Sequence, residues 1–252
     1  MNHDDYSFED SFDALKKIKQ KKIPLIFTTS KTKSEVIQLQ QKVGIVEPFI
    51  IENGAALFIP QGYQGLNLND LTTYDGYKSL IFGIKYNEIL KFYETYKDKF
   101  GMRGFSDMSL DEVMNLTGLD ANSATLSRQR DFSEPFIVKN NSMIDDLNKL
   151  AYENGMKITQ GGRFFHLIGL NQDKGIAVKK TSELFSKLFV QDILSIGLGD
   201  GINDIAMFEN VDKPIVIKNH YGEYVKSDID SIQLSSHKGS AGFNEMVLKN
   251  VS

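Results

Sequence analysis

An apolar run that ends in a turn rich in glycine and aspartate constrains the fold of this chain most strongly. The run extends from Ile193 to Ile196, and the hexapeptide Gly-Asp-Gly-Ile-Asn-Asp follows at positions 199–204. An apolar run, such a turn and then a helix start are typical of a buried parallel strand that delivers carboxylates to its carboxyl end. We therefore expect Asp200 and Asp204 to share one hard cation such as Mg²⁺. An ordinary turn with solvated carboxylates is the alternative, and the full hexapeptide after a strand favours the metal site.

Length and charge narrow the class of protein. The chain has 252 residues, a net charge of −4 and no cysteine. This length permits one large domain or two modest ones. The weak negative charge does not favour nucleic acid as a partner, and the lack of cysteine fits a cytoplasmic protein without disulfides. Because the sequence contains no apolar run of transmembrane length and no signal-peptide pattern, we expect no membrane partner. The oligomeric state is not indicated.

Helix and strand patterns alternate in the first third of the chain. Thr32 and Glu35 form a capping-box pattern at the start of a helix that ends near Gly44. Asn53-Gly54, between two apolar segments, predicts a hairpin. The expected elements are a helix over 8–18, a strand over 23–28, a helix from 32 to 44 and a strand over 49–51.

The middle of the chain indicates an α+β module inserted between two α/β halves. Long helical patterns and scattered short strands replace the regular alternation there. The expected helices cover 86–100, a short segment after the Ser109/Glu112 capping box, and 143–154; the expected strands cover 136–138, 156–159 and 163–167. The second half then resumes with a helix over 174–189, the aspartate-rich strand, and 214–217 as the last core strand.

Motifs spread along nearly the whole chain resemble those of the haloacid-dehalogenase-like hydrolases with a large cap between the second and third motifs, the C2 type. The core signals are Thr28-Thr29-Ser30-Lys31-Thr32, Glu52-Asn53-Gly54-Ala55, Asp173-Lys174-Gly175 and the hexapeptide. Two further segments are similar to the subfamily of mannosyl-3-phosphoglycerate phosphatases. They are Arg130-Asp131-Phe132-Ser133-Glu134-Pro135-Phe136 and Gly161-Gly162-Arg163-Phe164-Phe165-His166-Leu167.

The resemblance implies a three-layer, parallel-sheet, Rossmann-like hydrolase core with an inserted α+β cap domain. It places the discontinuous core at 1–85 and 170–252 and the cap at 86–169. Substrate is then expected under the cap, at the carboxyl ends of the core strands.

The resemblance also implies a Mg²⁺-dependent phosphatase that hydrolyses mannosyl-3-phosphoglycerate or a related phosphosugar through an aspartyl-phosphate. Thr29 matches the hydroxyl that binds the phosphoryl group, and Lys174 matches the cation that stabilises the phospho-intermediate. Asp200 and Asp204 match the metal ligands. Taken alone, Thr29 is better explained as a strand end or helix cap and Lys174 as a surface lysine, so the order and context of the motifs carry these two assignments.

The expected substrate-binding residues come from both the core and the cap motifs. A phosphoglycerate-bearing sugar carries a carboxylate and a phosphate, and the planar guanidinium of arginine suits both anions. For His166 the alternative is a satisfied, half-buried histidine, and for Asn53 it is a turn residue. The full set is Ser30, Asn53, Arg130, Ser133, Arg163 and His166.

One departure from the family pattern concerns its first motif, an apolar strand followed by Asp-any-Asp-Gly-Thr. The printed sequence has no such segment, and Asp4 and Asp5 are interpreted as part of a loop before the first helix. The nucleophile and the acid/base aspartate are therefore missing, and with them the first core strand. We expect either a start assigned too late or, alternatively, a truncated and inactive remnant that at most binds a metal or an anionic ligand.

Overall fold

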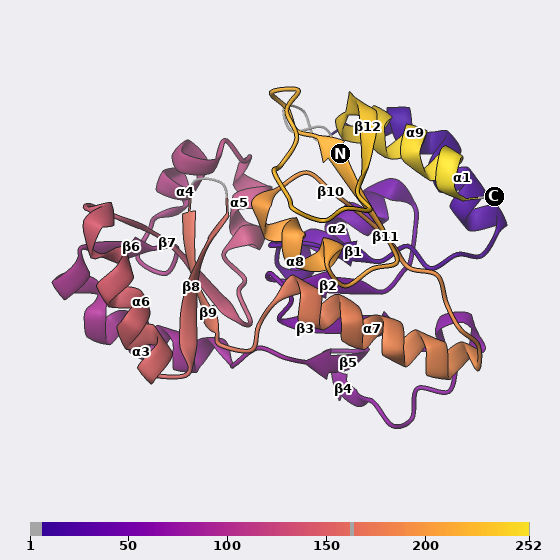
Figure 1. Ribbon diagram of the computed structural model, residues 1–252. Coiled ribbons are helices and arrows are strands. Elements are labelled where there is room, and N and C mark those ends of the chain that lie inside the picture. Colours follow the sequence, from indigo (N-terminus) through magenta and orange to yellow (C-terminus); the bar gives the residue numbers. More distant parts are fainter. Residues whose placement is uncertain (1–6, 162–163, 252) are drawn as a thin grey trace. The chain divides into compact units, whose positions relative to one another are not determined.

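The computed structural model describes residues 7–161 and 164–251 (Figure 1). These residues form two compact units. Of the described residues, 7–26, 62–68 and 174–251 belong to the first unit, and 27–61, 69–161 and 164–173 belong to the second unit. Within the described part of the chain, no helix has the length and apolar character needed to cross a bilayer.

A parallel sheet forms the centre of the first unit. Its strand order is β10-β11-β12, and all neighbouring strands run parallel. The strands are β10 (Ile196–Gly199), β11 (Lys213–Lys218) and β12 (Gln233–Lys238). The helices are η1 (Glu9–Ser11), α1 (Phe12–Gln20), η2 (Tyr63–Gly65), α7 (Lys174–Phe189), η4 (Ile202–Asp204), α8 (Ile205–Phe208) and α9 (Gly239–Asn250).

Successive residues of β11 explain why this sheet is covered on both faces. Ile215 and Ile217 pack with Met246 of α9, whereas Val216 packs with Met207 and Phe208 of α8. This follows from the two-residue period of a strand, which sends neighbouring side chains to opposite faces. A sheet buried on both faces requires a continuous apolar strand, as the sequence of β11 shows.

The second unit contains two sheets, and the first of them has the order β1-β2-β3-β5-β4. β1 pairs with β2 in parallel, and the remaining neighbours are antiparallel. Phe49 and Phe58, whose ring centroids lie 5.5 Å apart, pack with the rings of Tyr74 and Tyr77. The elements are β1 (Phe27–Thr28), α2 (Lys33–Val43), β2 (Phe49–Ile51), β3 (Ala56–Pro60), β4 (Thr72–Tyr74) and β5 (Tyr77–Ile81).

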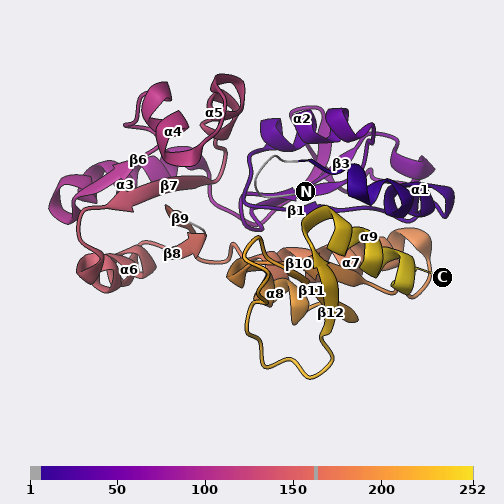
Figure 2. The same ribbon diagram turned by 90° about the horizontal axis from the view of Figure 1, so that it is seen from above.

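The other sheet of the second unit is antiparallel and has the order β6-β7-β9-β8. Phe136 of β7 joins the core formed with α3 and α6, and its neighbour Ile137 packs with residues of α4 and α5. Figure 2 shows α4 and α5 on one side of β7 and α6 on the other. The elements are α3 (Tyr86–Phe100), β6 (Met102–Gly104), α4 (Leu110–Thr117), α5 (Ala121–Ser127), β7 (Ser133–Val138), η3 (Asn141–Met143), α6 (Ile144–Glu153), β8 (Met156–Gly161) and β9 (Phe164–Gly169).

Three predicted strands differ from the structure, and the interpretation of Asp4 and Asp5 lies outside the described residues. The strand predicted over 23–28 is wrong before Phe27, where Pro24 has no N–H to give to a ladder. The aspartate-rich strand is β10, shifted from the apolar run at 193–196 into the hexapeptide. The prediction that 214–217 is the last core strand is wrong, because β12 follows; its only buried residue is Ser235, so no apolar run marks it.

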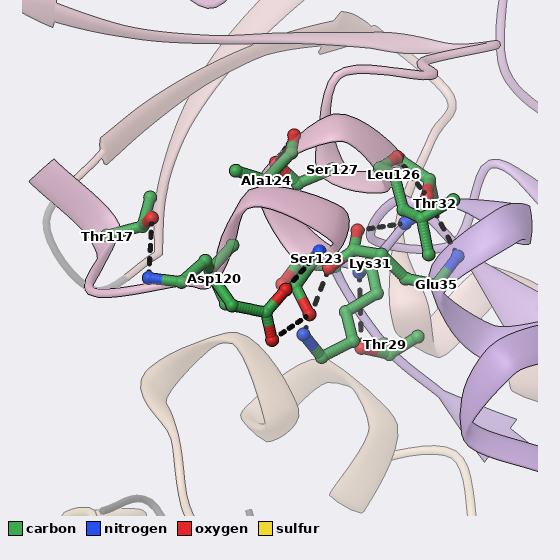
Figure 3. Close-up of polar contacts among 12 residues, drawn as sticks. Thr29, Lys31, Thr32, Glu35, Thr117, Asp120, Ser123, Ala124, Leu126 and Ser127 are labelled. Carbon is green, nitrogen blue, oxygen red and sulfur yellow. Dashed lines mark hydrogen bonds and ion pairs between the residues drawn. The ribbon is translucent and has the colours of Figure 1, made fainter. Parts of the chain in front are cut away.

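The start of α2 has a capping box, in which two residues cap each other's backbone amides (Figure 3). Buried Thr32 accepts the amide of Glu35 at 3.2 Å, Glu35 accepts the amide of Thr32 at 2.9 Å, and the Thr32 hydroxyl donates to the Leu126 carbonyl of α5 at 2.9 Å. We expect Thr32→Ala to lower the free energy of unfolding by about 1–3 kcal/mol, because it removes the cap and the buried hydrogen bond to the Leu126 carbonyl, which then keeps only the amide of Gln129 at 3.1 Å.

Urea denaturation of Thr32→Ala and Ser109→Ala tests this expectation. Ser109 forms the same capping box at α4, but it lies at the surface. Ser109→Ala is therefore expected to lose only about 0.5–1 kcal/mol. Equal losses in the two variants would contradict a role for the Leu126 bond.

Candidate active site

A buried ion pair joins the start of α7 to the turn after β10 in the first unit. Lys174 Nζ donates to Asp204 Oδ1 at 2.7 Å, and the two side chains are 6% and 10% exposed. Asp204 Oδ2 accepts the backbone amides of Asp200 and Gly201, each at 3.1 Å. Both oxygens of the Asp204 carboxylate are thus held in place, which orients it before any ligand binds.

Close packing of the turn explains its glycines. A Cβ at position 199 would lie 2.5 Å from Asp204 Oδ2, so only glycine allows this carboxylate to approach the strand end. Asp200 lies on the exposed side of the same turn. Desolvation raises the pKa of Asp200, and the negative charge of Asp204 raises it further. Two carboxylates that repel each other at one turn are an arrangement that a cation would relieve.

The donor set of this turn fits a hard cation that keeps part of its water. Asp200 and Asp204 supply carboxylate oxygens, which Mg²⁺ prefers, and Mg²⁺ commonly takes only one or two protein carboxylates. In the part of the chain that the structure describes, no three acidic, histidine or cysteine side chains form a metal cluster.

Gly175 is the position where α7 approaches α8, and it allows a second test. A Cβ at position 175 would lie 2.3 Å from the Ala206 carbonyl oxygen, which belongs to the backbone and cannot rotate away. We expect Gly175→Ala to lower the free energy of unfolding by about 1–3 kcal/mol, although alanine is the better helix former by about 1 kcal/mol. Chemical denaturation provides the measurement.

Ile176→Ala serves as its control, because this neighbouring side chain is 43% exposed. A change within about 0.5 kcal/mol is expected there. A Gly175→Ala protein as stable as the parent would show that α7 and α8 are farther apart than in the structure.

In the second unit, the loop after β1 is tied to the turn after β2. The Thr29 amide donates to the Ile50 carbonyl at 3.0 Å, and the Asn53 amide donates to the Thr29 carbonyl at 2.9 Å. The Thr29 hydroxyl accepts the amide of Lys31 at 3.2 Å (Figure 3), an interaction that does not use the hydroxyl hydrogen. Asn53 is buried and has a φ of 58°. This is the left-handed conformation that the tight turn of a β-hairpin commonly requires.

Arg130 links the same loop to the segment before β7. Its Nη1 donates to the Ser30 carbonyl and its Nε to the Ser127 carbonyl, both at 2.8 Å. Ser133 is fully buried, and its hydroxyl donates to Glu52 Oε2 at 2.5 Å. The Ser133 hydroxyl is therefore directed at a side chain of the protein.

His166 is a buried histidine on β9. It lies opposite Pro135 and Thr159 in the sheet, and 6% of its surface is exposed. Its Nδ1 has no hydrogen-bond partner within the described residues. Burial lowers the pKa of His166 to about 3, and the charge of Arg130 contributes to this, so the ring is neutral at pH 7. Arg163, the remaining predicted residue, lies outside the described residues.

Comparison with known proteins places these features in one family. Residues 1–240 match the model of the haloacid dehalogenase-like hydrolases. The chain belongs to the haloacid dehalogenase-like hydrolase family. The predicted resemblance and the enzyme class, a phosphoric monoester hydrolase, are thereby confirmed, since the curated relatives are named phosphatases.

Two such relatives share the name glucosyl-3-phosphoglycerate/mannosyl-3-phosphoglycerate phosphatase. The protein from Persephonella marina is 45% identical over 247 residues, which cover 98% of this chain and 91% of the relative. The protein from Methanococcoides burtonii is 34% identical over 252 residues, which cover 98% and 92%.

Solved structures support the predicted α/β hydrolase fold. A protein from Thermoplasma acidophilum, 19% identical, superposes with a TM-score of 0.68 over 98% of this chain and 92% of its own. At this identity the likeness concerns the fold alone. It confirms the fold class expected from the sequence of this member of the haloacid dehalogenase-like hydrolases.

Two polar residues near the predicted ones were given no role from the sequence: Glu52, which is named above only as part of a core motif, and Gln172. Both are completely buried, and Gln172 Nε2 donates to the Glu52 carbonyl at 2.6 Å. Glu52 directly follows the buried strand β2, and an acidic residue at the end of such a strand is the signal that could have found it. No local pattern marks Gln172.

Proposed function

We propose that this family member is a Mg²⁺-dependent phosphatase that hydrolyses mannosyl-3-phosphoglycerate or a related phosphosugar through an aspartyl-phosphate. The observation that carries the proposal is the oriented Asp204 carboxylate, bound to Lys174 and next to Asp200 in the turn after β10. A cationic side chain and two carboxylates at a strand end are suited to bind a metal–phosphate group. The names of the two curated relatives support the choice of substrate.

The proposed roles follow from the chemistry of each side chain. Lys174 stabilises negative charge on the phosphoryl oxygens, and Thr29, whose hydroxyl accepts the Lys31 amide, donates its hydroxyl hydrogen to a phosphoryl oxygen. Asp200 and Asp204 would hold the cation, and a bound Mg²⁺ would supply positive charge against the phosphate. Catalysis would then depend on positioning and electrostatic stabilisation, as in other phosphoryl transfers. We keep 1–85 and 170–252 as the proposed core and 86–169 as the proposed cap.

The proposed specificity concerns the carboxylate and the hydroxyl groups of the substrate. Arg130 uses two N–H groups on backbone carbonyls, and a guanidinium has five, so donors remain for a carboxylate. Neutral His166 suits a hydroxyl rather than an anion, because it carries no charge. Ser30, Asn53 and Arg163 complete the proposed set, and Ser133 contributes through Glu52.

A phosphate-release assay on mannosyl-3-phosphoglycerate tests the proposal. Because the printed sequence has no Asp-any-Asp-Gly-Thr segment, the assay compares the 252-residue chain with a version that is extended by the upstream in-frame codons. We expect the extended version to release phosphate with Mg²⁺ and to stop when EDTA removes the metal. Phosphate release by the 252-residue chain would contradict the expectation that this chain lacks its nucleophile.

A failure of both versions with Mg²⁺ would overturn the proposed activity. It would favour the alternative of an inactive remnant that binds a metal or an anion. Glucose 6-phosphate serves as the control substrate, since it has a phosphate and a sugar but no carboxylate. Equal rates on both substrates would contradict the glycerate part of the proposed specificity.

A further inference from the structure

The carboxylate of Glu52 lies where several segments of the second unit meet. Glu52 directly follows β2 and has no exposed surface. Its φ is 44°, a left-handed conformation that is unfavourable for a residue with a long side chain. Such strain persists only where surrounding contacts hold the residue in place, and it is frequent at functional sites.

Three hydrogen bonds bring the segment that leads into β7 onto this carboxylate. Glu52 Oε1 accepts the amide of Asp131 at 2.9 Å. Glu52 Oε2 accepts the amide of Phe132 at 3.1 Å and the hydroxyl of Ser133 at 2.5 Å. Burial raises the pKa of Glu52, while the charge of Arg130 and these donors oppose the increase. A carboxylate with such contacts fixes the path of the chain through residues 131–133.

The backbone of the same residue holds two further segments. The Glu52 amide donates to the Lys31 carbonyl at 3.0 Å, so the loop that carries Thr29 is bound to it. The Glu52 carbonyl accepts Gln172 Nε2 at 2.6 Å, and Gln172 Oε1 in turn accepts the amide of Gly169 at 3.2 Å. One residue therefore joins the loop after β1, the chain before β7 and the chain after β9.

Arg130 lies within this arrangement, directly before the three residues that Glu52 binds. Its guanidinium donates to the Ser30 and Ser127 carbonyls, both at 2.8 Å, and its backbone continues directly into segment 131–133. The position of the guanidinium therefore depends on the loop after β1, on the end of α5 and on the path of segment 131–133. We propose that Glu52 is a positioning residue, which sets the Arg130 guanidinium against the loop of Thr29 and Ser30 and thereby determines affinity for the substrate carboxylate. This inference rests on the proposed function for its ligand.

Glu52→Gln is the most informative variant, since it keeps the size of the side chain. A glutamine replaces one of the two carboxylate oxygens by an NH₂ group. At that position two hydrogen-bond donors then face each other, the NH₂ group and the donor from segment 131–133. Glu134→Gln is the matched control: Glu134 is equally buried and accepts the Ser106 amide at 2.8 Å and the Tyr86 hydroxyl at 2.5 Å, but it does not bind segment 131–133.

Two readouts are measured on the full chain. The first is amide hydrogen exchange at positions 131 and 132, which requires no ligand. The second is calorimetric binding of mannosylglycerate, the dephosphorylated product, and of inorganic phosphate. We expect Glu52→Gln to speed exchange at both amides at least about tenfold and to weaken mannosylglycerate binding about tenfold, with phosphate affinity changed less than about twofold. Glu134→Gln should leave all three unchanged.

The outcomes separate this inference from the proposed function. Unchanged exchange at 131 and 132 in Glu52→Gln, or the same loss of mannosylglycerate binding in both variants, would overturn the positioning role. In a further outcome, the parent chain does not bind mannosylglycerate, but Glu52→Gln still speeds amide exchange. That result would overturn the proposed substrate and, with the substrate, the proposed effect of Glu52 on affinity. If phosphate and mannosylglycerate weaken equally, Glu52 supports the whole unit rather than Arg130, which also refutes the proposal.

Discussion

Replacing Asp204 with alanine is expected to lower the free energy of unfolding by about 3–5 kcal/mol, because it leaves the Lys174 ammonium buried without its counter-charge. Lys174 Nζ lies 2.7 Å from Asp204 Oδ1, and the side chains of Lys174 and Asp204 are 6% and 10% exposed. The same change also removes the acceptor of the Asp200 and Gly201 amides. Urea denaturation gives the free energy, and phosphate release of the extended version is expected to be lost.

A double-mutant cycle and a surface pair provide the controls for Asp204→Ala. Lys174→Met/Asp204→Ala should be about 1–4 kcal/mol more stable than Asp204→Ala alone, since methionine needs no partner. Asp146 and Lys149 form an exposed ion pair at 3.0 Å, with side chains 72% and 74% exposed. Asp146→Ala is expected to change stability by less than about 1 kcal/mol. A similarly small effect of Asp204→Ala would contradict the buried pair.

The second large effect concerns the dependence of stability on pH. Burial, aided by the charge of Arg130, lowers the pKa of His166 to about 3, whereas an unfolded histidine titrates near 6.5. Between these values the unfolded chain binds one proton that the folded chain does not. Stability is therefore lost as the pH falls, by about 1.4 kcal/mol per pH unit, or about 2–3 kcal/mol between pH 6.5 and 4.5.

In His166→Leu the folded and unfolded chains no longer differ in proton binding at position 166. We therefore expect this variant to lose about 2–3 kcal/mol less stability than the parent between pH 6.5 and 4.5. Urea denaturation at several pH values between 7.5 and 4.5 gives the profile. His220, a half-buried histidine after β11, provides the control, and His220→Gln should retain the slope of the parent chain. An identical pH profile for His166→Leu and the parent would show that His166 is not buried as a neutral ring.

Elements with strong local signals agree closely with the structure. The helices predicted over 86–100 and 174–189 coincide with α3 and α7, and both capping boxes form with reciprocal hydrogen bonds. Caps and helical periodicity act within a few residues, so a short window of sequence contains the relevant energies. The hairpin at Asn53-Gly54 is likewise correct, since β2 and β3 pair around it.

Elements without such signals were missed or shifted. β12 is an edge strand with polar residues, and its pairing depends on β11, which precedes it by a long loop. The β4–β5 hairpin and β6 are short and were not predicted. Their pairing partners lie elsewhere in the sheet, so a reading of local periodicity contains little of the energy that stabilises them.

The pattern of residues alone was sufficient to find the turn at 199–204, whereas Lys174, Thr29 and Arg130 became candidates through the resemblance to the haloacid-dehalogenase-like hydrolases. The partners of these side chains came only with the folded chain. Lys174 bonds to a residue 30 positions away, and Glu52 reaches Ser133 over 81 positions. Local geometry depends on neighbours in the sequence, whereas a buried charge is satisfied by whichever polar groups the path of the chain brings to it.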